Sequence, residues 1–229
     1  MSLRVITFDC ANTLVETSWD YAEHAMACLD RLGVATDPEW PIVYRRLLMR
    51  SWPEYREMNQ ARPHEADAWW LAFTQVFLEH AGLSRDLAPL LMEASEDLLY
   101  RKDKMDFRVY GDIVETLAAL RDRGFRLGVI SNWDYSLGKV LESRGLAQYF
   151  EVVTASLVFG VEKPDPLIFQ HTLERLGATP AEALHIGDNP LDDFHGARCA
   201  GLRALLVDRS QPRSTDVMLH DMRELLNRV

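Results

Sequence analysis

The sequence predicts an α/β fold, in which a Rossmann-like parallel sheet carries helices on both faces and a separate all-helical segment is inserted. Two observations support this prediction. From about residue 110 onward, short apolar runs alternate with helical segments that end at glycines. Between about residues 17 and 101, apolar residues recur at helical spacing only. This insertion separates the first expected strand from the other strands of its sheet.

The expected strands are short, apolar and rich in β-branched residues. They are Val5–Phe8, Arg126–Ile130, Glu151–Thr154, Ala183–Ile186 and Arg203–Val207. The helices expected between them are Ile113–Arg123, Tyr135–Arg144, Pro166–Leu176 and Asp192–Cys199, and a terminal helix follows the last strand. Strands that alternate with helices in this way pair in parallel, because each helix returns the chain to the same end of the sheet.

The inserted segment predicts about four helices separated by turn-forming residues. The expected breaks are Gly33, Thr36-Asp37-Pro38, Ser51-Trp52-Pro53, Arg62-Pro63 and Gly82-Leu83-Ser84. Five of the six tryptophans fall in this segment, where helical spacing favours a role in its core. We therefore expect an α/β core domain of residues 1–15 and 106–229, and a helical cap domain of residues 16–105.

Composition limits the classes of function. The chain has 229 residues and a formal net charge of −10, and it lacks the basic stripe that a nucleic-acid partner requires. Its three cysteines are widely spaced, which is typical of reduced thiols and not of a disulfide framework or a zinc site. The amino terminus runs directly into a strand-like segment, so we expect no signal peptide, and no apolar run reaches membrane-spanning length. We expect a cytoplasmic protein.

Four polar segments mark a candidate site, because each follows an apolar stretch and would lie at the carboxyl end of a strand. They are Asp9-Cys10-Ala11-Asn12-Thr13, Ser131-Asn132, Lys163-Pro164 and Gly187-Asp188-Asn189-Pro190-Leu191-Asp192-Asp193. In open α/β sheets, ligands bind at that edge. The segments would bring together a carboxylate to attack, hydroxyls and an amine to hold an anion, and several carboxylates to hold a cation.

In their order and context, these segments resemble the four motifs of the haloacid dehalogenase (HAD) superfamily of hydrolases. The position of the insertion resembles the helical C1 cap of subfamily I. The resemblance covers nearly the whole chain, although the insertion matches only in position and helical character. It implies a phosphatase-like hydrolase that acts on a small phosphorylated metabolite.

The resemblance also implies roles for individual residues. Asp9 would be the nucleophile that forms an aspartyl-phosphate. The hydroxyls of Thr13 and Ser131 would donate hydrogen bonds to the phosphoryl oxygens. Asn132 would bind the same substrate group at a helix start, where backbone N–H groups favour an anion. Lys163 would neutralise charge between the nucleophile and the phosphate.

The cofactor implied by the resemblance is Mg²⁺, a cation that prefers oxygen ligands. Asp9, Asp188 and Asp193 would form the site, in which Asp188 would bind the cation directly and Asp193 would act through water or from outside the direct ligands. The main-chain carbonyl of Ala11 would supply a further oxygen. We interpret the adjacent Asp192 as a helix cap or a surface acid.

Ala11 departs from the family pattern, in which a second Asp at this position protonates the leaving group and activates water. Alanine does neither, and positioned acid–base catalysis contributes about 10²- to 10⁴-fold. We therefore expect slow hydrolysis of ordinary phosphate esters. Asn12 replaces the usual glycine, but Asn tolerates a positive φ and should preserve the turn.

Other family members without the second Asp provide alternatives. Phosphonoacetaldehyde hydrolases need a lysine in the insertion, and no lysine precedes Lys102. Dehalogenases of the 2-haloacid type work without metal and lack the Gly-Asp pair found at Gly187-Asp188, so dehalogenation is disfavoured. One further alternative stays open. The chain could be a catalytically impaired HAD-fold protein that binds a phosphorylated ligand, or a protein partner through its cap. We interpret Cys10 as a packing residue and His185 as a satisfied core histidine.

Overall fold

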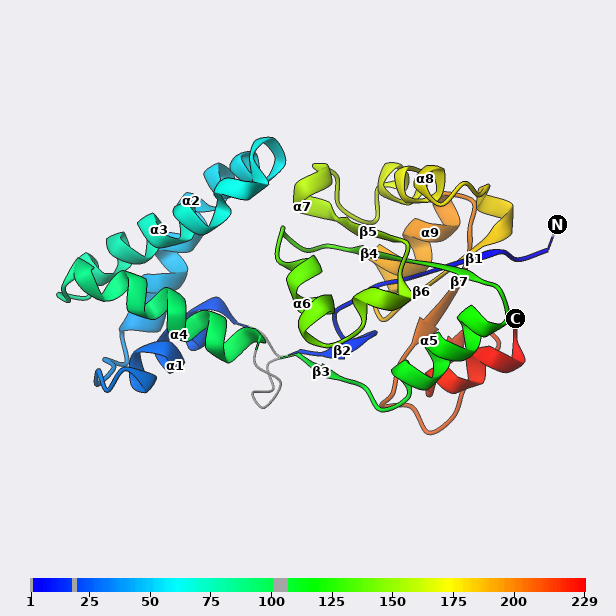
Figure 1. Ribbon diagram of the computed structural model, residues 1–229, viewed down its shortest axis with the longest axis horizontal. Helices are drawn as coiled ribbons and strands as arrows, with labels where there is room; N and C mark the ends of the chain where they lie inside the picture. Colours follow the sequence, from blue (N-terminus) through cyan, green and yellow to red (C-terminus); the bar gives the residue numbers. More distant parts are fainter. Residues whose placement is uncertain (1, 18–19, 101–106) are drawn as a thin grey trace. The chain divides into compact units, whose positions relative to one another are not determined.

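The computed structural model describes residues 2–17, 20–100 and 107–229, and the chain divides into two compact units. One unit combines Met1–Thr17 with Phe107–Val229, and the other is Ser18–Asp106 (Figure 1). Since each unit has its own core, each is described by itself. In the part of the chain that the structure describes, no helix combines the length and the apolar character needed to span a membrane.

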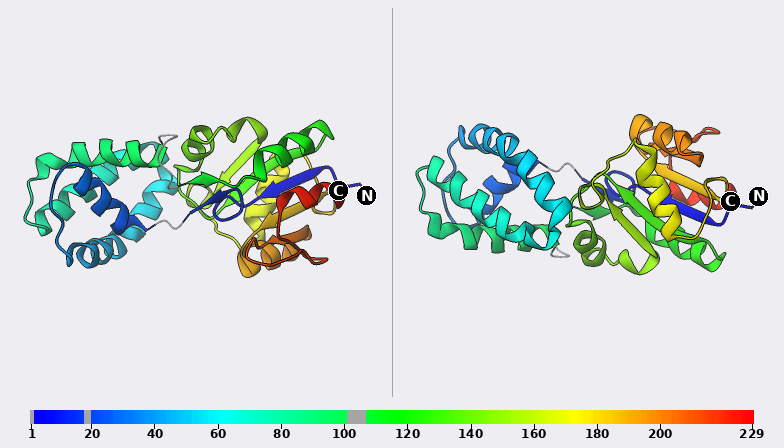
Figure 2. Two further views of the ribbon diagram at one scale, coloured as in Figure 1. Left: turned by 90° about the horizontal axis from the view of Figure 1, so that it is seen from below. Right: turned by 90° about the horizontal axis from the view of Figure 1, so that it is seen from above.

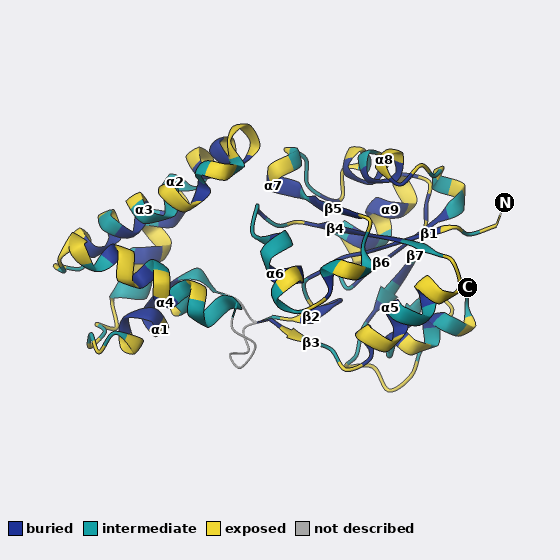
Figure 3. Cartoon of the chain, in the orientation of Figure 1, coloured by how far each residue is buried: buried dark blue, intermediate teal, exposed yellow. Residues whose placement is uncertain are grey.

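The core of the first unit is a six-stranded sheet of order β5-β4-β1-β6-β7-β8, and every neighbouring pair is parallel. The strands are β1 (Val5–Phe8), β4 (Arg126–Ser131), β5 (Val152–Ala155), β6 (Ala183–Gly187), β7 (Arg203–Val207) and β8 (Met218–Leu219). The predicted parallel α/β fold is therefore confirmed. Strand β8 was not predicted, since two residues are too few to give a period. The central strands β1 and β6 are buried along their whole length (Figure 3).

Helices cover both faces of this sheet. On one face lie α8 (Pro166–Arg175) and α9 (Gly196–Cys199), which contact each other and the strands. Apolar side chains of these helices, such as Phe169, pack with Val5 and Ile130 of the sheet. On the other face lie α5 (Ile113–Asp122) and a 3₁₀ helix over Met222–Asn227, which also contact each other (Figure 1). The short helices α6 (Leu137–Ser143) and α7 (Ser156–Phe159) complete the unit.

Three helices of the core differ from the prediction by more than one terminal residue or in helix type. Helix α6 begins at Leu137 and not at Tyr135. The segment expected as one helix over Asp192–Cys199 is a π-helical turn, Pro190–His195, followed by α9. This turn begins early because the Asn189 side chain accepts hydrogen bonds from the N–H groups of residues 191 and 192. The terminal helix is a 3₁₀ helix, which Asp221 caps.

A two-stranded antiparallel ribbon lies where the chain leaves and re-enters this unit. It pairs β2 (Val15–Glu16) with β3 (Arg108–Val109). Arg108 also forms an ion pair with Glu16 across the ribbon. The ribbon therefore joins the turn after β1 to the chain that continues into α5.

The second unit contains the helices α1 (Tyr21–Arg31), α2 (Trp40–Ala61), α3 (Ala66–His80) and α4 (Ala88–Tyr100). Short 3₁₀ turns, Pro63–Glu65 and Arg85–Leu87, precede α3 and α4. Helix α1 contacts α2 and α4, and α3 contacts the same two, so the four form a closed bundle (Figure 2). Within the described residues, this agrees with the about four helices expected.

The break predicted at Ser51-Trp52-Pro53 is wrong, because α2 continues through Pro53. Packing on both sides of the proline explains the difference. Tyr55 is fully buried, and its ring lies 5.1 Å from that of Trp52 and 4.6 Å from that of Trp69. Burial of such rings offsets the hydrogen bond that a proline removes from a helix.

The tryptophans of the second unit pack against its core, as helical spacing indicated. Trp40, Trp52, Trp69 and Trp70 are partly buried against it, whereas Trp19 lies outside the described residues. Trp69 stacks on Phe73 with ring centroids 5.4 Å apart. These rings hold the bundle together by burying large apolar surfaces.

Candidate active site

Asp9 directly follows β1 and is anchored to both neighbouring strands. Its N–H donates to the carbonyl of Ile186 on β6 at 2.8 Å. Its Oδ1 accepts from Ser131 Oγ at 2.9 Å and from Lys163 Nζ at 2.6 Å. Ser131 is the last residue of β4, which pairs with β1. The sheet therefore brings the carboxylate of the first motif and the hydroxyl of the second into direct contact.

The turn after Asp9 has the conformation that Asn12 was expected to allow, with a φ of 53° at Asn12. The Asn12 N–H donates to the carbonyl of Val15, and Asn12 Oδ1 accepts from the N–H of Thr17. Ala11 is partly exposed in this turn and pairs with Val15. Thr13 is fully buried, and its hydroxyl donates to Asp188 Oδ1 at 3.4 Å.

Lys163 is held at its main chain and at its ammonium group. Asn132 Oδ1 accepts from the Lys163 N–H at 2.8 Å, and Asn132 Nδ2 donates to the Lys163 carbonyl at 3.0 Å. The side chain is 2% exposed, and Nζ lies 2.6 Å from Asp9 and 2.5 Å from Asp193. Because α6 begins only at Leu137, placing Asn132 at a helix start was wrong.

Asp193 lies in the π-helical turn and faces the end of β6. A Cβ added to Gly187 would lie 2.1 Å from Asp193 Cγ, so only glycine leaves room for this carboxylate. Its Oδ2 accepts from the N–H of Asn189 at 3.0 Å. Its Oδ1 receives Lys163 Nζ and lies 3.1 Å from His185 Nε2. The neighbouring Asp192 accepts instead from the Asn189 side chain, close to the surface.

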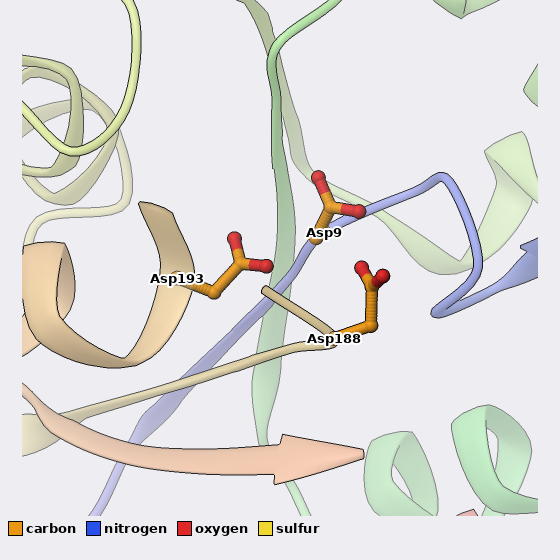
Figure 4. A group of neighbouring side chains, drawn as sticks. All are labelled: Asp9, Asp188 and Asp193. Carbon is orange, nitrogen blue, oxygen red and sulfur yellow. The ribbon is translucent and has the colours of Figure 1, made fainter. Parts of the chain in front are cut away.

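The carboxylates of Asp9, Asp188 and Asp193 converge on one space (Figure 4). One oxygen of each lies within 4.8 Å of the others. Oxygen atoms at this spacing match the ligand chemistry of a hard divalent cation. Three carboxylates against the single ammonium of Lys163 leave an excess of negative charge, which a cation would offset. The residues present therefore fit a metal ion.

The surroundings shift the pKa of each carboxylic acid differently. Burial, followed by the neighbouring carboxylates of Asp9 and Asp193, raises the pKa of Asp188 to about 6. Burial also raises the pKa of Asp9, although the Lys163 ammonium opposes it. Burial would raise the pKa of Asp193 too, but the hydrogen bond from His185 and the charge of Lys163 hold it well below its usual range. Asp193 is therefore ionised in the metal-free protein.

Lys163 and Cys10 also have shifted pKa values. Burial alone would lower the pKa of Lys163, but the charges of Asp9 and Asp193 outweigh it and raise the pKa. Lys163 is therefore an ammonium cation at neutral pH. Burial raises the pKa of the Cys10 thiol well above its usual value. A fully buried thiol with a raised pKa is inert, which supports the interpretation of Cys10 as a packing residue.

Sequence reasoning missed the part that His185 plays in this cluster. His185 is buried and hydrogen-bonded, as expected, but one of its partners is Asp193. The other is Thr7, its direct partner in the register of β1 and β6. The sequence did contain a signal for this contact. Side chains alternate along a strand, so His185 lies on the same face of β6 as Gly187.

Arg209 was also missed, and no sequence motif marks it. It follows β7, and its guanidinium donates to the carbonyls of Asn12 at 3.2 Å and Thr13 at 3.0 Å. Asp112 accepts from the same guanidinium at 3.1 Å, and the Tyr110 ring lies 3.7 Å from it. Arg209 therefore ties the turn after Asp9 to two other parts of the first unit.

Comparisons with known proteins agree with this architecture. A family model described as haloacid dehalogenase-like hydrolase matches residues 3–201. The chain is 31% identical to haloacid dehalogenase-like hydrolase domain-containing protein 3 of Bos taurus, over 93% of this chain and 84% of that protein. It is 29% identical to a glyceraldehyde 3-phosphate phosphatase of Methanopyrus kandleri, over 93% of this chain and 90% of that one.

A solved structure of a 2-haloacid dehalogenase from Pseudomonas syringae superimposes with a TM-score of 0.71. It is 27% identical and covers 98% of this chain and 97% of its own. The family model spans most of the chain, including all four motifs. The chain therefore belongs to the haloacid dehalogenase-like hydrolases.

Proposed function

We propose that this hydrolase is a Mg²⁺-dependent phosphatase that acts on a small phosphorylated metabolite through an aspartyl-phosphate on Asp9. The observation that carries the proposal is the position of Asp9. Its carboxylate contacts Ser131 and Lys163, and it shares a space with Asp188 and Asp193. The relative from Methanopyrus kandleri, which is named a phosphatase, supports the same chemistry. We also propose that residues 16–105 act as the cap domain of a core formed by residues 1–15 and 106–229.

In this proposal, Asp9, Asp188, Asp193 and the carbonyl oxygen of Ala11 hold the cation. The donor set consists of oxygens alone, which suits Mg²⁺ better than metals that favour nitrogen or sulfur ligands. When bound, Mg²⁺ would stabilise negative charge on the phosphoryl oxygens and on the nucleophile. Thr13 contacts Asp188 in the described structure, so it would also help to orient this carboxylate.

The first step would be attack by a carboxylate oxygen of Asp9 on phosphorus. A bond from oxygen to phosphorus forms, the bond to the leaving oxygen breaks, and that oxygen keeps the electron pair. Ser131 and Lys163 would hold the Asp9 carboxylate in place by their two hydrogen bonds on Oδ1. Lys163, together with Thr13, Ser131 and Asn132, would also hold the phosphoryl group. Water would then attack the phosphorus, the bond from phosphorus to the Asp9 oxygen would break, and the carboxylate of Asp9 would be restored. Phosphate would leave with the oxygen of that water, and the protons of the water would pass to phosphate and to solvent.

Ala11 determines which substrates suit this site. Because alanine cannot protonate the leaving oxygen, a leaving group that is stable without a proton has the advantage. Acyl and aryl phosphates meet that condition, whereas alkyl phosphates do not. Loss of a positioned acid costs about 10²- to 10⁴-fold, so the disadvantage of alkyl phosphates should be of that order.

Dehalogenation of a 2-halo acid is the second candidate, because the similar structure from Pseudomonas syringae carries that name. The carboxylate cluster argues against it. A metal-free reaction gains nothing from Asp188 beside Asp9, since like charges oppose one another. The cluster is useful only where a cation offsets it, so phosphatase chemistry comes first.

A screen of phosphorylated metabolites, with Mg²⁺ and with a chelator, tests the proposal. We expect turnover of acyl or aryl phosphates only with Mg²⁺, and its loss in Asp9→Asn. Asp192→Asn is the matched control, because it makes the same substitution in an acid that bonds to Asn189 outside the cluster. Full activity in Asp9→Asn, or turnover of 2-halo acids in the chelator, would refute the proposal.

A further inference from the structure

Thr7 and His185 form a buried polar pair below the candidate site. They are register partners on the neighbouring central strands β1 and β6, and both are fully buried. Thr7 Oγ1 lies 2.9 Å from His185 Nδ1. Burying two polar side chains costs free energy unless each finds a partner, and apolar residues would fill the same space without that cost. The pair therefore calls for an explanation beyond packing.

The hydrogen bonds continue from this pair to the candidate nucleophile. His185 Nε2 lies 3.1 Å from Asp193 Oδ1, and Lys163 Nζ donates to the same oxygen at 2.5 Å. Lys163 Nζ also donates to Asp9 Oδ1 at 2.6 Å. A continuous buried chain thus runs from Thr7 through His185, Asp193 and Lys163 to Asp9.

Elementary chemistry sets the direction of each hydrogen bond in this chain. An ionised carboxylate only accepts, so His185 Nε2 carries the hydrogen that points at Asp193. His185 Nδ1 faces the Thr7 hydroxyl, which can donate a hydrogen to it. In the neutral ring Nδ1 has no hydrogen and accepts from the Thr7 hydroxyl.

The Asp193 carboxylate then receives three donors. They are His185 Nε2 and Lys163 Nζ on Oδ1, and the N–H of Asn189 on Oδ2. The Phe169 ring meets the imidazole edge-on at 5.1 Å and limits its rotation. Without His185, Oδ1 would keep Lys163 as its single hydrogen-bond donor, and that flexible side chain also bonds to Asp9.

We propose that His185, oriented by Thr7, is a positioning residue that fixes the Asp193 carboxylate and thereby holds the Lys163 ammonium against Asp9. His185 touches neither the proposed substrate nor the proposed nucleophile, and it acts only through Asp193. The consequence for turnover rests on the proposed phosphatase function. The expected hydrogen bonding of the His185 imidazole does not depend on that function, because it follows from contacts in the metal-free protein.

Kinetics on the best phosphate from the screen test the effect on turnover. His185→Leu removes the donor, and we expect kcat to fall about 10- to 100-fold with little change in KM, as for other outer partners of a metal site. His185→Gln keeps an N–H donor at a similar distance and should recover most of that loss. Thr154→Val is the control, because it removes another buried hydroxyl bond, to Thr172, away from the carboxylates. Equal losses in His185→Leu and His185→Gln, or no loss, would mean that His185 only packs.

Nitrogen-15 NMR of the histidines in the metal-free protein gives a second readout that needs no turnover. We expect a hydrogen on His185 Nε2, with the signals assigned as those missing from His185→Gln. Thr7→Val should shift the Nδ1 signal and leave the hydrogen on Nε2, whereas Thr154→Val should shift neither. An Nε2 without a hydrogen, or a His185 signal indifferent to Thr7→Val, would overturn the inference even if His185→Leu does not fold. If the protein hydrolyses no phosphate, the proposed function fails, but the NMR experiment still tests how the His185 ring is oriented.

Discussion

Gly187 and Asp193 are in such close contact that residue 187 has no room for a side chain. A Cβ there would lie 2.1 Å from Asp193 Cγ and 2.5 Å from its Cβ. Both atoms belong to the short stem of a buried side chain, which cannot move aside. The glycine before Asp188 therefore allows the carboxylate cluster to form.

Gly187→Ala should displace Asp193 and disrupt the cluster. We expect a loss of about 1–3 kcal/mol in the free energy of unfolding, typical of overpacking, and loss of Mg²⁺-dependent turnover. Gly138→Ala is the matched control, because a Cβ at Gly138 in α6 meets no atom within 4 Å. Urea unfolding and activity assays measure both effects. Wild-type turnover in Gly187→Ala would contradict the assignment of Asp193.

Lys163→Met should be strongly destabilising. It leaves Asp9 and Asp193 buried without their shared cation, and removal of one partner from a buried pair costs about 3–5 kcal/mol. Adding Asp193→Asn to Lys163→Met removes one of the two unpaired charges and should recover part of the loss. Urea unfolding at neutral pH in a chelator measures each variant. Stability unchanged in Lys163→Met would show that the ammonium is not held as described.

The raised pKa of Asp188 predicts how stability depends on pH in the metal-free protein. Since its pKa is about 6 in the folded protein, against an ordinary value of 3.8, the folded state binds this proton more tightly than the unfolded state. The contribution of this group to stability is therefore full at low pH and is lost as the pH rises to 6. In a chelator, Asp188→Asn should be more stable than wild type at pH 8, and the difference should shrink toward pH 4.

Magnesium should make the wild-type protein more stable than Asp188→Asn. A cation bound only by the folded state stabilises it, so Mg²⁺ should raise the melting temperature of the wild-type protein. Asp188→Asn lacks one ligand and should respond much less. Thermal melts between pH 4 and 8, with Mg²⁺ and with a chelator, test both statements. A melting temperature of the wild type that is insensitive to Mg²⁺ would argue against the proposed cofactor.

Ala11→Asp should separate an enzyme with its own proton source from a site that has lost its acid. If only the acid is missing, hydrolysis of alkyl phosphates should rise by about 10²-fold or more. Ala11→Asn, which adds similar bulk without an acid, is the control. A large gain over a wild type that turns over no phosphate would favour the catalytically impaired binding protein, whereas real wild-type turnover without such a gain favours an enzyme with another proton source.

Pro53→Ala should stabilise the helical unit, because α2 continues through this residue and an alanine can make the missing hydrogen bond. We expect a gain of about 1–3 kcal/mol in the free energy of unfolding. Pro41→Ala, in the first turn of the same helix, should have little effect, since that N–H has no partner within the helix. Lower stability in Pro53→Ala would mean that the proline is needed for the packing around Tyr55.

Much of the core could be predicted from local patterns. Strands β1 (Val5–Phe8) and β7 (Arg203–Val207) have the predicted bounds, because an apolar run between polar neighbours is itself the signal for a buried strand. The helix break predicted at Pro53 was wrong because contacts distant in sequence decided the structure there. A local signal there was overridden by aromatic packing between helices, which no short window of sequence contains.

By itself, the sequence determined the alternation of strands and helices, and therefore the edge where Asp9 and Asp188 lie, because parallel strands all end on one side. Only the tertiary structure decided how the side chains pair at that edge. Asn132 clamps the main chain of Lys163, Thr7 meets His185, and Arg209 reaches a turn 197 residues away. These contacts depend on strand register and on backbone positions to within a few tenths of an ångström, and these follow from the packing of the whole unit.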